Sequence, residues 1–507
     1  MIWTSLLLSQ VLLTCNPTDG VPLRFGFPLP AERLGGGLRL RGDPRASLQW
    51  RLLQNRPDPY TGRVWVELCI TSSGRAGSGR RVQIVAGGSG PTDPALGPVV
   101  RRVVQSREDA DRRTRVVCWR WQTGEVDRVE YIEFLTRQVY LEEEFGAGET
   151  LTLGLDGGLD GARFSGSGIR TRDWRKAGVL PPGGGLGREF RRHLVALAPR
   201  LGQLRALRDR GDYLRSGGIM TNLEFDTSLA LARLALAEDG AGRGDLLRWA
   251  LRGALHTVGQ DLDAKTSLSF AHGSDHRTGR PDPGHTWLSG ILLVGCLAGD
   301  DTLLNAARRI ARGLARHRAA GDAETDRIRD VGWPLLEMET WLRFAEDPEV
   351  EAGADRLVSE LLSRWDEDNR VFRFGEGERR SGVYAEPAWV TAGCLLPGLR
   401  AYLRRRPHRE VATMVGALER RLSDLVRNGR PGLPLRYWVV DNQVVGQSRQ
   451  VGMPGGFMLL EGLPLAELRR CLDRGMVRDA LLQVPREDDE DLATSFSIVG
   501  RCLWILR

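Results

Sequence analysis

Lysine is nearly absent from this chain of 507 residues, where it occurs only at Lys176 and Lys265. Arginine therefore supplies almost all of the positive charge, and the formal net charge is +7 at pH 7. An excess of positive charge favours anionic partners such as nucleic acid, an acidic polysaccharide or a membrane surface. The arginines are scattered among acidic residues rather than grouped in a stripe, which argues against nucleic acid.

The sequence also lacks paired cysteines. Its seven cysteines are widely spaced and never form a CxxC pair. Cys296 and Cys394 fall in apolar segments with helical periodicity, where a free cysteine behaves as a small hydrophobic residue. Neither a disulfide framework nor a zinc site is predicted, and we expect no metal and no cofactor.

No apolar run approaches the ~20 residues that a membrane-spanning helix needs. The segment MIWTSLLLSQVLLT at the start is apolar, but no lysine or arginine precedes it, and Ser9 and Gln10 interrupt it. A β-strand over residues 9–16 is therefore favoured over a signal segment. On this basis a cytoplasmic location is slightly favoured over export.

The length predicts two or three domains. Up to about residue 175, short segments rich in Val, Ile, Trp, Tyr and Phe alternate with Gly, Pro, Asn and Asp clusters, at a spacing typical of a β barrel or sandwich. A Gly- and Pro-rich break near 87–98 divides this region. We predict a β-barrel-like domain over 1–95, a second, short β module over 96–176 and a linker over 177–187.

From residue 188 to 507 the periodicity is helical. Helices are expected at 188–209, 227–238, 243–259, 285–298, 301–318, 334–346, 349–364, 386–404, 408–428, 453–462, 465–484 and 491–506. In this series the even-numbered helices are the more apolar and the odd-numbered helices are amphipathic. Long connections precede the apolar helices, so antiparallel pairing places these connections on one face. The pattern predicts a toroid of six helical hairpins, (α/α)6, within a multidomain α+β chain.

The stretch 270–299, FAHGSDHRTGRPDPGHTWLSGILLVGCLAG, is a polar loop that leads into an apolar helix, which must be buried on all sides. His285 and Trp287 lie at the helix entrance, where His285 can act as a base or proton shuttle. The alternative is a buried histidine satisfied by hydrogen bonds. His272 and His276 form an HxxxH motif, but no third ligand is evident and a metal site is disfavoured.

Other long connections carry polar and aromatic residues too. In GDYLRSGGIMTNLEFD, Asn222, Glu224 and Asp226 alternate, so an extended segment would point them the same way. The alternative for Asp226 is a helix N-cap. Aromatic residues near charged or amide groups are typical of a sugar-binding cleft, although a single tryptophan is more often core. Such residues recur at Trp333, Glu337, Glu339, Tyr384, Glu386, Trp389, Trp438 and Arg449.

Three segments resemble the exo-acting rhamnogalacturonan lyase family of pectin-degrading enzymes. They are VPLRFGFPLPAERL near the start, GDY…TNLEFDTSLAL, and PGHTWLSGILLVGCLAGDDTLLNAA. The resemblance implies an N-terminal β barrel, a central β-sandwich and a C-terminal (α/α) toroid. Two features depart from that pattern: the region 100–175 is short for a full sandwich, and Lys265 is the only lysine of the helical part.

The resulting hypothesis is a polysaccharide lyase that cleaves an acidic, uronate-containing glycan by β-elimination. His285 is the candidate base, Tyr384 the proton donor, and Arg280, Arg449 or Asn222 the group that neutralises the uronate carboxylate. One alternative is a glycoside hydrolase with a carboxylate pair, one member from Glu224 or Asp226 and the other from Glu337, Glu339 or Glu386. The other alternative is a non-catalytic glycan-binding toroid. The expected partner is an acidic oligo- or polysaccharide. Candidate substrate-binding residues are Tyr213, Glu224, Asp226, His272, His276, Trp287, Trp333, Glu337, Glu386, Trp389 and Trp438.

Overall fold

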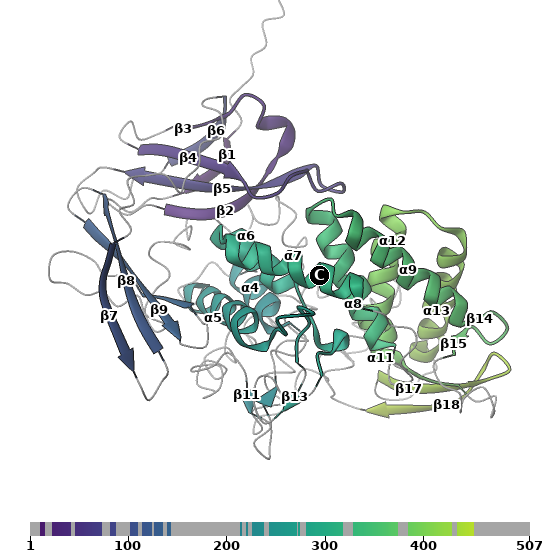
Figure 1. Ribbon diagram of the computed structural model, residues 1–507. Coiled ribbons are helices and arrows are strands. Elements are labelled where there is room, and N and C mark those ends of the chain that lie inside the picture. Colours follow the sequence, from purple (N-terminus) through teal and green to yellow (C-terminus); the bar gives the residue numbers. More distant parts are fainter. Residues whose placement is uncertain are drawn as a thin grey trace, which may run out of the picture. The chain divides into compact units, whose positions relative to one another are not determined.

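The computed structural model describes residues 11–15, 23–41, 46–72, 82–87, 102–109, 114–123, 126–134, 139–142, 213–214, 220–221, 226–237, 243–270, 272–273, 280–317, 328–373, 384–427 and 433–450 (Figure 1). These residues fall into two compact units. The first unit comprises the described residues of Met1–Gly183, Leu231–Gln260 and Ile291–Leu304. The second comprises those of Gly184–Ala230, Asp261–Gly290 and Asn305–Arg507.

The first unit contains three separate antiparallel sheets. One has the order β2 (Leu23–Pro30), β5 (Arg63–Ser72), β4 (Ala46–Leu52), and another the order β1 (Val11–Cys15), β6 (Val82–Ala86), β3 (Leu38–Arg41). The third is a meander of β10 (Val139–Glu142), β9 (Val126–Phe134), β8 (Thr114–Thr123) and β7 (Arg102–Asp109). The strand expected over 9–16 is confirmed by β1. The described strands form small open sheets, so the predicted β barrel is not confirmed.

The sheet β2–β5–β4 is apolar on one face and polar on the other. Val64, Val66 and Leu68 of β5 are buried with Trp50 of β4, as the alternation of side chains along a strand requires. Glu67 points the opposite way and pairs with Arg51 of β4. The sequence alternation RVWVELC of β5 accounts for both faces.

The turn that ends helix α6 (Ser289–Ala298) lies against this polar face. Arg51 pairs with Asp301 at 3.0 Å and donates a hydrogen bond to the carbonyl of Gly299 at 3.4 Å. Gly299 has φ +63°, and a Cβ built there would lie 2.4 Å from Oε1 of Glu67. Glycine is therefore required at this position by both the backbone conformation and the close approach.

The described chain from residue 227 to 427 is mainly helical, which confirms the helix-rich C-terminal part. The longer helices are α4 (Thr227–Ala237), α5 (Arg243–His256), α6, α7 (Asp301–Arg316), α8 (Arg329–Phe344), α9 (Pro348–Arg364), α12 (Leu396–Arg405) and α13 (Arg409–Arg427). Within the described residues no helix is long and apolar enough to cross a bilayer.

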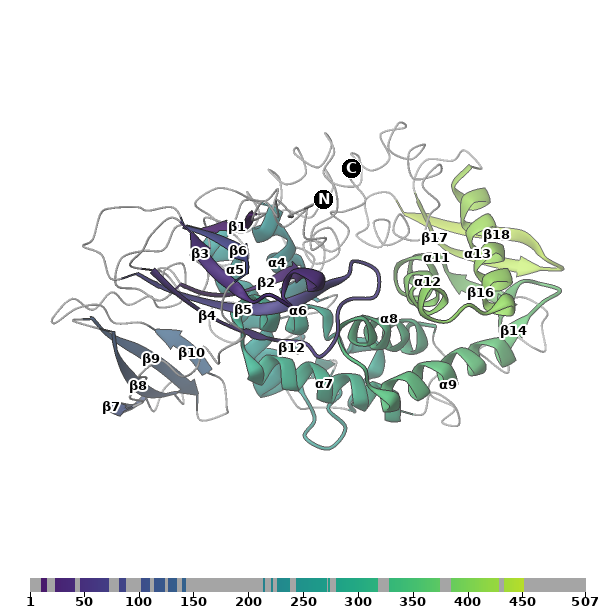
Figure 2. The same cartoon turned by 90° about the horizontal axis from the view of Figure 1, so that it is seen from above.

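In the pairs α6–α7 and α8–α9 the first helix is the more deeply buried. In α6 only Ser289 and Leu293 are partly exposed, whereas α7 alternates buried apolar residues with exposed polar ones. The helix α8 packs against both α9 and α12, and α13 packs against α12 and α9 (Figure 2). The predicted difference between a buried and an amphipathic helix is thus seen in α6–α7 and α8–α9, but not in α12–α13. The segments needed to close a ring of six hairpins lie outside the described residues.

Three predicted helix boundaries were wrong. The helix expected at 285–298 begins at Ser289, because Pro283–His285 form a 3₁₀ turn and Thr286 is extended. The helix expected at 334–346 begins at Arg329, and Pro334 is its sixth residue, where a proline has no N–H to donate to the preceding turn. The region 386–404 opens with strand β16 (Tyr384–Pro387), short α11 (Ala388–Val390) and a π-helical turn, Thr391–Leu395, before α12.

Several of the long connections contain short strands. One sheet consists of β11 (Tyr213–Leu214), β12 (Met220–Thr221) and β13 (His272–Gly273). A second consists of β14 (Trp365–Asp366) and β15 (Val371–Phe372). A third consists of β16, β17 (Leu433–Val440) and β18 (Gln443–Gln450). Asp441 and Asn442, both with positive φ, form the tight turn between β17 and β18.

Candidate functional site

A short turn before α6 holds His285 in a defined orientation. Asp282 is extended, and its Oδ1 accepts a hydrogen bond from the backbone N–H of Gly284 at 2.7 Å. Its Oδ2 lies 2.8 Å from Nδ1 of His285. Pro283 suits the first position of the turn because its φ is already restricted. The sequence DPGH therefore specifies both the turn and the partner of the imidazole ring.

The second nitrogen of His285 contacts an arginine from another helix. Nη2 of Arg329, the first residue of α8, lies 2.9 Å from Nε2 of His285 and donates to the carbonyl of Gly284 at 3.1 Å. A guanidinium group can only donate, so Nε2 accepts and Nδ1 carries the proton that is donated to Asp282. His285 is thus a neutral imidazole. We call Asp282, His285 and Arg329 the entrance cluster.

The entrance cluster is almost closed to solvent. His285 is 3% exposed and packs edge-to-face on Trp287, with ring centroids 6.0 Å apart. Trp287 packs in the same way on Trp333, at 5.9 Å. Trp333 has no exposed surface and Trp287 is 6% exposed, which fits the core interpretation of these rings rather than a stacking platform.

Two buried carboxylates cap the N-terminus of α6. Oε2 of Glu337 accepts hydrogen bonds from the backbone N–H groups of Leu288 and Ser289, at 3.0 and 2.8 Å. Oδ2 of Asp226 accepts from Gly290 at 2.7 Å, while its Oδ1 accepts from Leu229 in the first turn of α4. These carboxylates neutralise the positive end of the α6 dipole. The contacts account structurally for Asp226 and Glu337, and their roles in substrate binding stay predictions.

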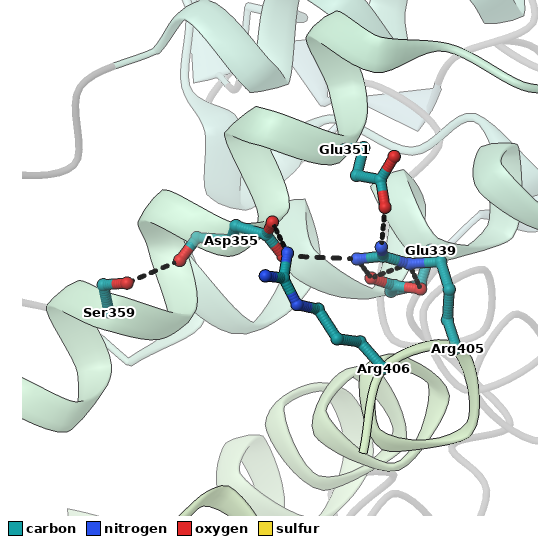
Figure 3. Close-up of polar contacts among 6 residues, drawn as sticks. All are labelled: Glu339, Glu351, Asp355, Ser359, Arg405 and Arg406. Carbon is teal, nitrogen blue, oxygen red and sulfur yellow. Dashed lines mark hydrogen bonds and ion pairs between the residues drawn. The ribbon is translucent and has the colours of Figure 1, made fainter. Parts of the chain in front are cut away.

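Further along α8, Glu339 belongs to a network of ion pairs (Figure 3). Arg405 of α12 binds it through Nε and Nη2, at 3.0 and 2.8 Å, and binds Glu351 of α9 through Nη1 at 2.6 Å. Arg406 pairs with Asp355 of α9. Burial raises the pKa of Glu339 above its usual value, against the opposing effect of Arg405. We call these five residues the Arg405 cluster.

The structure brings other predicted site residues together in the small sheets. Strand β12 pairs with β11 and β13, and Thr221 faces both Tyr213 and His272. The sheet β16–β17–β18 contains Tyr384, Glu386, Trp438 and Arg449; Tyr384 pairs with Val439 and Glu386 with Tyr437. Six predicted site residues lie in these two sheets: Tyr213, His272, Tyr384, Glu386, Trp438 and Arg449. Among them the structure describes only the side chain of Trp438, which is half-buried.

Five predicted site residues remain, and the structure describes only part of them. Arg280 is exposed. Trp389 lies in α11, where its side chain is outside the described part, and Asn222, Glu224 and His276 lie wholly outside it. In the part of the chain that the structure describes, no three His, Cys, Asp or Glu side chains gather as a metal site would require.

Sequence reasoning missed Asp282 and Arg329. A signal for Asp282 was present, because Asp before Pro-Gly is typical of a capped turn and His285 follows three residues later. Arg329 is 44 positions away from His285 and has no local signal. Its contact arises only because α8 packs against the turn that precedes α6.

No family model matches the sequence, and no curated protein matches it either. Among solved structures, a cellobiose 2-epimerase from Bacillus thermoamylovorans B4167 is similar with a TM-score of 0.42 and 10% identity, over 59% of this chain and 85% of that one. A β-1,3-1,4-glucanase from Paenibacillus sp. X4 has a TM-score of 0.40 and 11% identity, over 64% and 94%. A polysaccharide lyase is similar with a TM-score of 0.40 and 10% identity, over 62% of this chain and 97% of that one.

These three similar proteins are enzymes of sugars and polysaccharides, and they differ in the reaction that they catalyse. Similarity of this degree does not establish a reaction for the present chain, since one architecture can serve several chemistries.

Proposed function

We propose that this protein is a carbohydrate-active enzyme that cleaves an acidic, uronate-containing glycan by β-elimination. The observation that carries the proposal is the entrance cluster, in which a neutral histidine is oriented by a carboxylate on one side and contacts an arginine on the other. Elimination requires a base, a cation that stabilises the charge developing on the uronate carboxylate, and an acid at the leaving oxygen.

The residues of the entrance cluster match two of these requirements. His285 is the proposed base, and Asp282 is placed to stabilise the imidazolium that forms when the ring accepts a proton. Arg329 supplies a guanidinium group beside the ring, a geometry suited to a carboxylate. Tyr384 remains the proposed proton donor, in strand β16. The resemblance to exo-acting rhamnogalacturonan lyases suggests a pectic polymer as the substrate.

Hydrolysis by a carboxylate pair is less well supported. Among the acids considered for it, Asp226 and Glu337 cap α6, and Glu339 is bound by Arg405. A general acid or a nucleophile needs a carboxyl group that can reach the glycosidic bond. The contacts of these three carboxylates serve helix packing, so elimination is the better account of the described residues.

The experiment is a screen of pectic and glycosaminoglycan polymers, with products identified by mass and by the absorbance of unsaturated uronates. The wild-type protein should release unsaturated products, which are lighter by one water than hydrolysis products. His285→Ala should lower the rate by at least about 100-fold, the effect typical of losing a general base. His408→Ala, in the connection between α12 and α13, is the matched control and should retain the wild-type rate.

Each alternative has its own outcome. Saturated products would establish hydrolysis instead of elimination. Binding of an acidic oligosaccharide without any product, with equal affinity in the wild type and in His285→Ala, would indicate a non-catalytic glycan-binding protein. Unfolding midpoints of both variants confirm that a lost rate reflects chemistry and not a lost fold.

A further inference from the structure

One buried arginine holds two hairpin turns together. Arg421 of α13 is 8% exposed, and its Nη1 donates to the carbonyl of Arg370 at 2.8 Å. Its Nη2 donates to the carbonyl of Asn369 at 2.9 Å and to Oδ1 of Asn442 at 2.6 Å. Asn369 and Arg370 lie in the turn between β14 and β15, and Asn442 lies in the turn between β17 and β18 (Figure 1). A single guanidinium group therefore fixes both turns relative to α13.

The two turns are also joined to each other. The backbone N–H of Asn442 donates to Oδ1 of Asn369 at 2.9 Å. Asp366, at the start of the first turn, accepts hydrogen bonds from the backbone N–H and from the side-chain amide of Asn369, at 3.0 and 3.2 Å. The side-chain amide of Asn369 thus uses both its oxygen and its nitrogen. We call Arg421, Asn369, Arg370 and Asn442 the hairpin latch.

The hairpin latch holds backbone conformations that most residues avoid. Arg370, Asp441 and Asn442 have φ of +54°, +45° and +59°. Asparagine and aspartate adopt such left-handed values more readily than other residues, whereas arginine rarely does. The carbonyl of Arg370 is bound by Arg421, and its N–H donates to the carbonyl of Asp366 at 2.6 Å. Conformations of this kind persist where the surroundings hold them, and they are frequent at functional sites.

The hairpin latch adjoins the sheet that carries four predicted site residues. Val439 of β17 precedes Asn442 by three positions and pairs with Tyr384, the first residue of β16. Strand β15, which follows Arg370 directly, packs against β16. The strand that begins at Tyr384 is therefore contacted by both hairpins whose turns the latch joins.

We propose that Arg421 is a positioning residue for the sheet β16–β17–β18. By tying the two hairpins to α13, it keeps β16, which carries the proposed proton donor Tyr384, in a fixed place; this inference rests on the proposed function. Arg421 acts through the backbone of the hairpins and does not itself touch the substrate. The leaving oxygen takes its proton only from a donor within hydrogen-bond distance, so a displaced β16 lowers kcat more than it changes KM.

Two variants of Asn442 separate the hydrogen bond from the backbone conformation. Asn442→Gly permits the positive φ but removes the acceptor for Arg421, whereas Asn442→Asp retains both. On the polymer that the wild type cleaves, Asn442→Gly should lower kcat about 10-fold with little change in KM. Asn442→Asp should retain the wild-type kcat. Asp441→Gly is the matched control, since Asp441 is the exposed neighbour in the same turn, and it should also retain the wild-type kcat.

Removing the guanidinium group tests the whole latch. Arg421→Met loses all three hydrogen bonds and should lower kcat about 100-fold. Arg420→Met, at the exposed arginine next to it, should leave kcat unchanged. Rates are measured below the lowest unfolding midpoint of the set. If Arg421→Met does not fold, Asn442→Gly still tests the proposal, because Asn442 lies in a surface turn and is only half-buried.

Hydrogen exchange of the full-length protein measures the positioning without any substrate. In Arg421→Met and Asn442→Gly, the backbone amides of β16 should exchange at least about 10-fold faster than in the wild type, together with those of both turns. The amides of α8 should exchange as in the wild type, which shows that the rest of the fold is retained.

The outcomes separate this inference from the proposed function. If exchange becomes faster only at residues 441–442, or if the variants cleave a polymer with the wild-type kcat, the inference is wrong although the lyase proposal stands. If β16 exchanges faster as expected but the wild type cleaves no polymer, the hold of Arg421 on the sheet stands and the lyase proposal fails.

Discussion

Helix α8 carries two buried polar clusters whose arginines have different partners. Arg329 of the entrance cluster is its first residue, and Glu339 of the Arg405 cluster follows ten positions later, about 15 Å along the helix at ~1.5 Å per residue. Arg405 contacts carboxylates from two helices, whereas Arg329 donates to a neutral imidazole and a backbone carbonyl.

This difference separates a structural cluster from a candidate functional one. In the Arg405 cluster each charge meets an opposite charge, so the network holds α8, α9 and α12 together and has nothing to gain from an added anion (Figure 3). In the entrance cluster Arg329 contacts an imidazole ring whose other nitrogen faces Asp282, an arrangement that can orient a base. Burial of charge alone therefore does not indicate a site; the identity of the partner does.

The largest expected effect concerns the Arg405 cluster. Arg405→Ala leaves Glu339, which is 1% exposed, buried without its two-pronged partner. We expect the free energy of unfolding to fall by about 3–5 kcal/mol, as when one partner of a buried ion pair is removed. Urea denaturation measures the change.

Two controls sharpen this result. Arg404→Ala removes the neighbouring exposed arginine and should change the free energy of unfolding by no more than about 0.5 kcal/mol. The double variant Glu339→Leu/Arg405→Met replaces the buried pair by apolar groups and should recover most of the loss. Equal stabilities of Arg405→Ala and Arg404→Ala would show that the cluster does not hold the helices together.

An intermediate effect is expected in the entrance cluster. In Asp282→Asn one of the two acceptor oxygens becomes an NH₂ donor, which conflicts with the hydrogen bonds from Gly284 and from Nδ1 of His285. The ring should then favour the tautomer that carries its proton on Nε2, opposite the donors of Arg329. We expect kcat/KM on a cleaved polymer to fall about 100-fold, with less loss of stability than in Arg405→Ala.

Asp263→Asn is the matched control, because Asp263 also accepts hydrogen bonds from a backbone turn but lies away from the histidine. It should keep the wild-type kcat/KM. The ¹⁵N resonances of His285 report its tautomer independently of activity, and an unchanged tautomer in Asp282→Asn would contradict the proposed role of Asp282.

The smallest effect comes from a carboxylate outside both clusters. Burial tends to raise the pKa of Asp366, but hydrogen bonds from Asn369 and Arg373 outweigh it and lower the pKa from 3.8 to about 2. Because the folded pKa is the lower one, the stabilisation is present above pH 3.8 and is lost as the pH falls to about 2. Asp366→Asn should therefore flatten the pH dependence of the urea midpoint in this range.

The exposed neighbour provides the comparison for that measurement. Asp368→Asn should leave the wild-type slope between pH 3.8 and about 2 unchanged. If Asp366→Asn has the same slope as the wild type, the turn between β14 and β15 does not couple this carboxyl group to folding.

Much of the helical part could be predicted because its signals are local. The apolar segment of α4 and the alternating pattern of α7 specify which faces are buried, and both helices were placed to within two residues. The hairpin β17–β18 also had a local signal, Asp441 and Asn442 between β-branched residues, but it was interpreted only as a loop. The start of α8 was misplaced because Pro334 was taken as a first helical residue.

The candidate site depended on contacts that no local pattern contains. The sequence by itself determined where most described helices form and which side of each is apolar, because these properties follow from residues within a few turns of one another. Only the tertiary structure decided that Arg329 contacts His285, and that Glu337 and Asp226 cap a helix whose start is 48 and 64 positions away. Such partners are chosen by how the helices pack, since a hydrogen bond depends on distance in space and not along the chain.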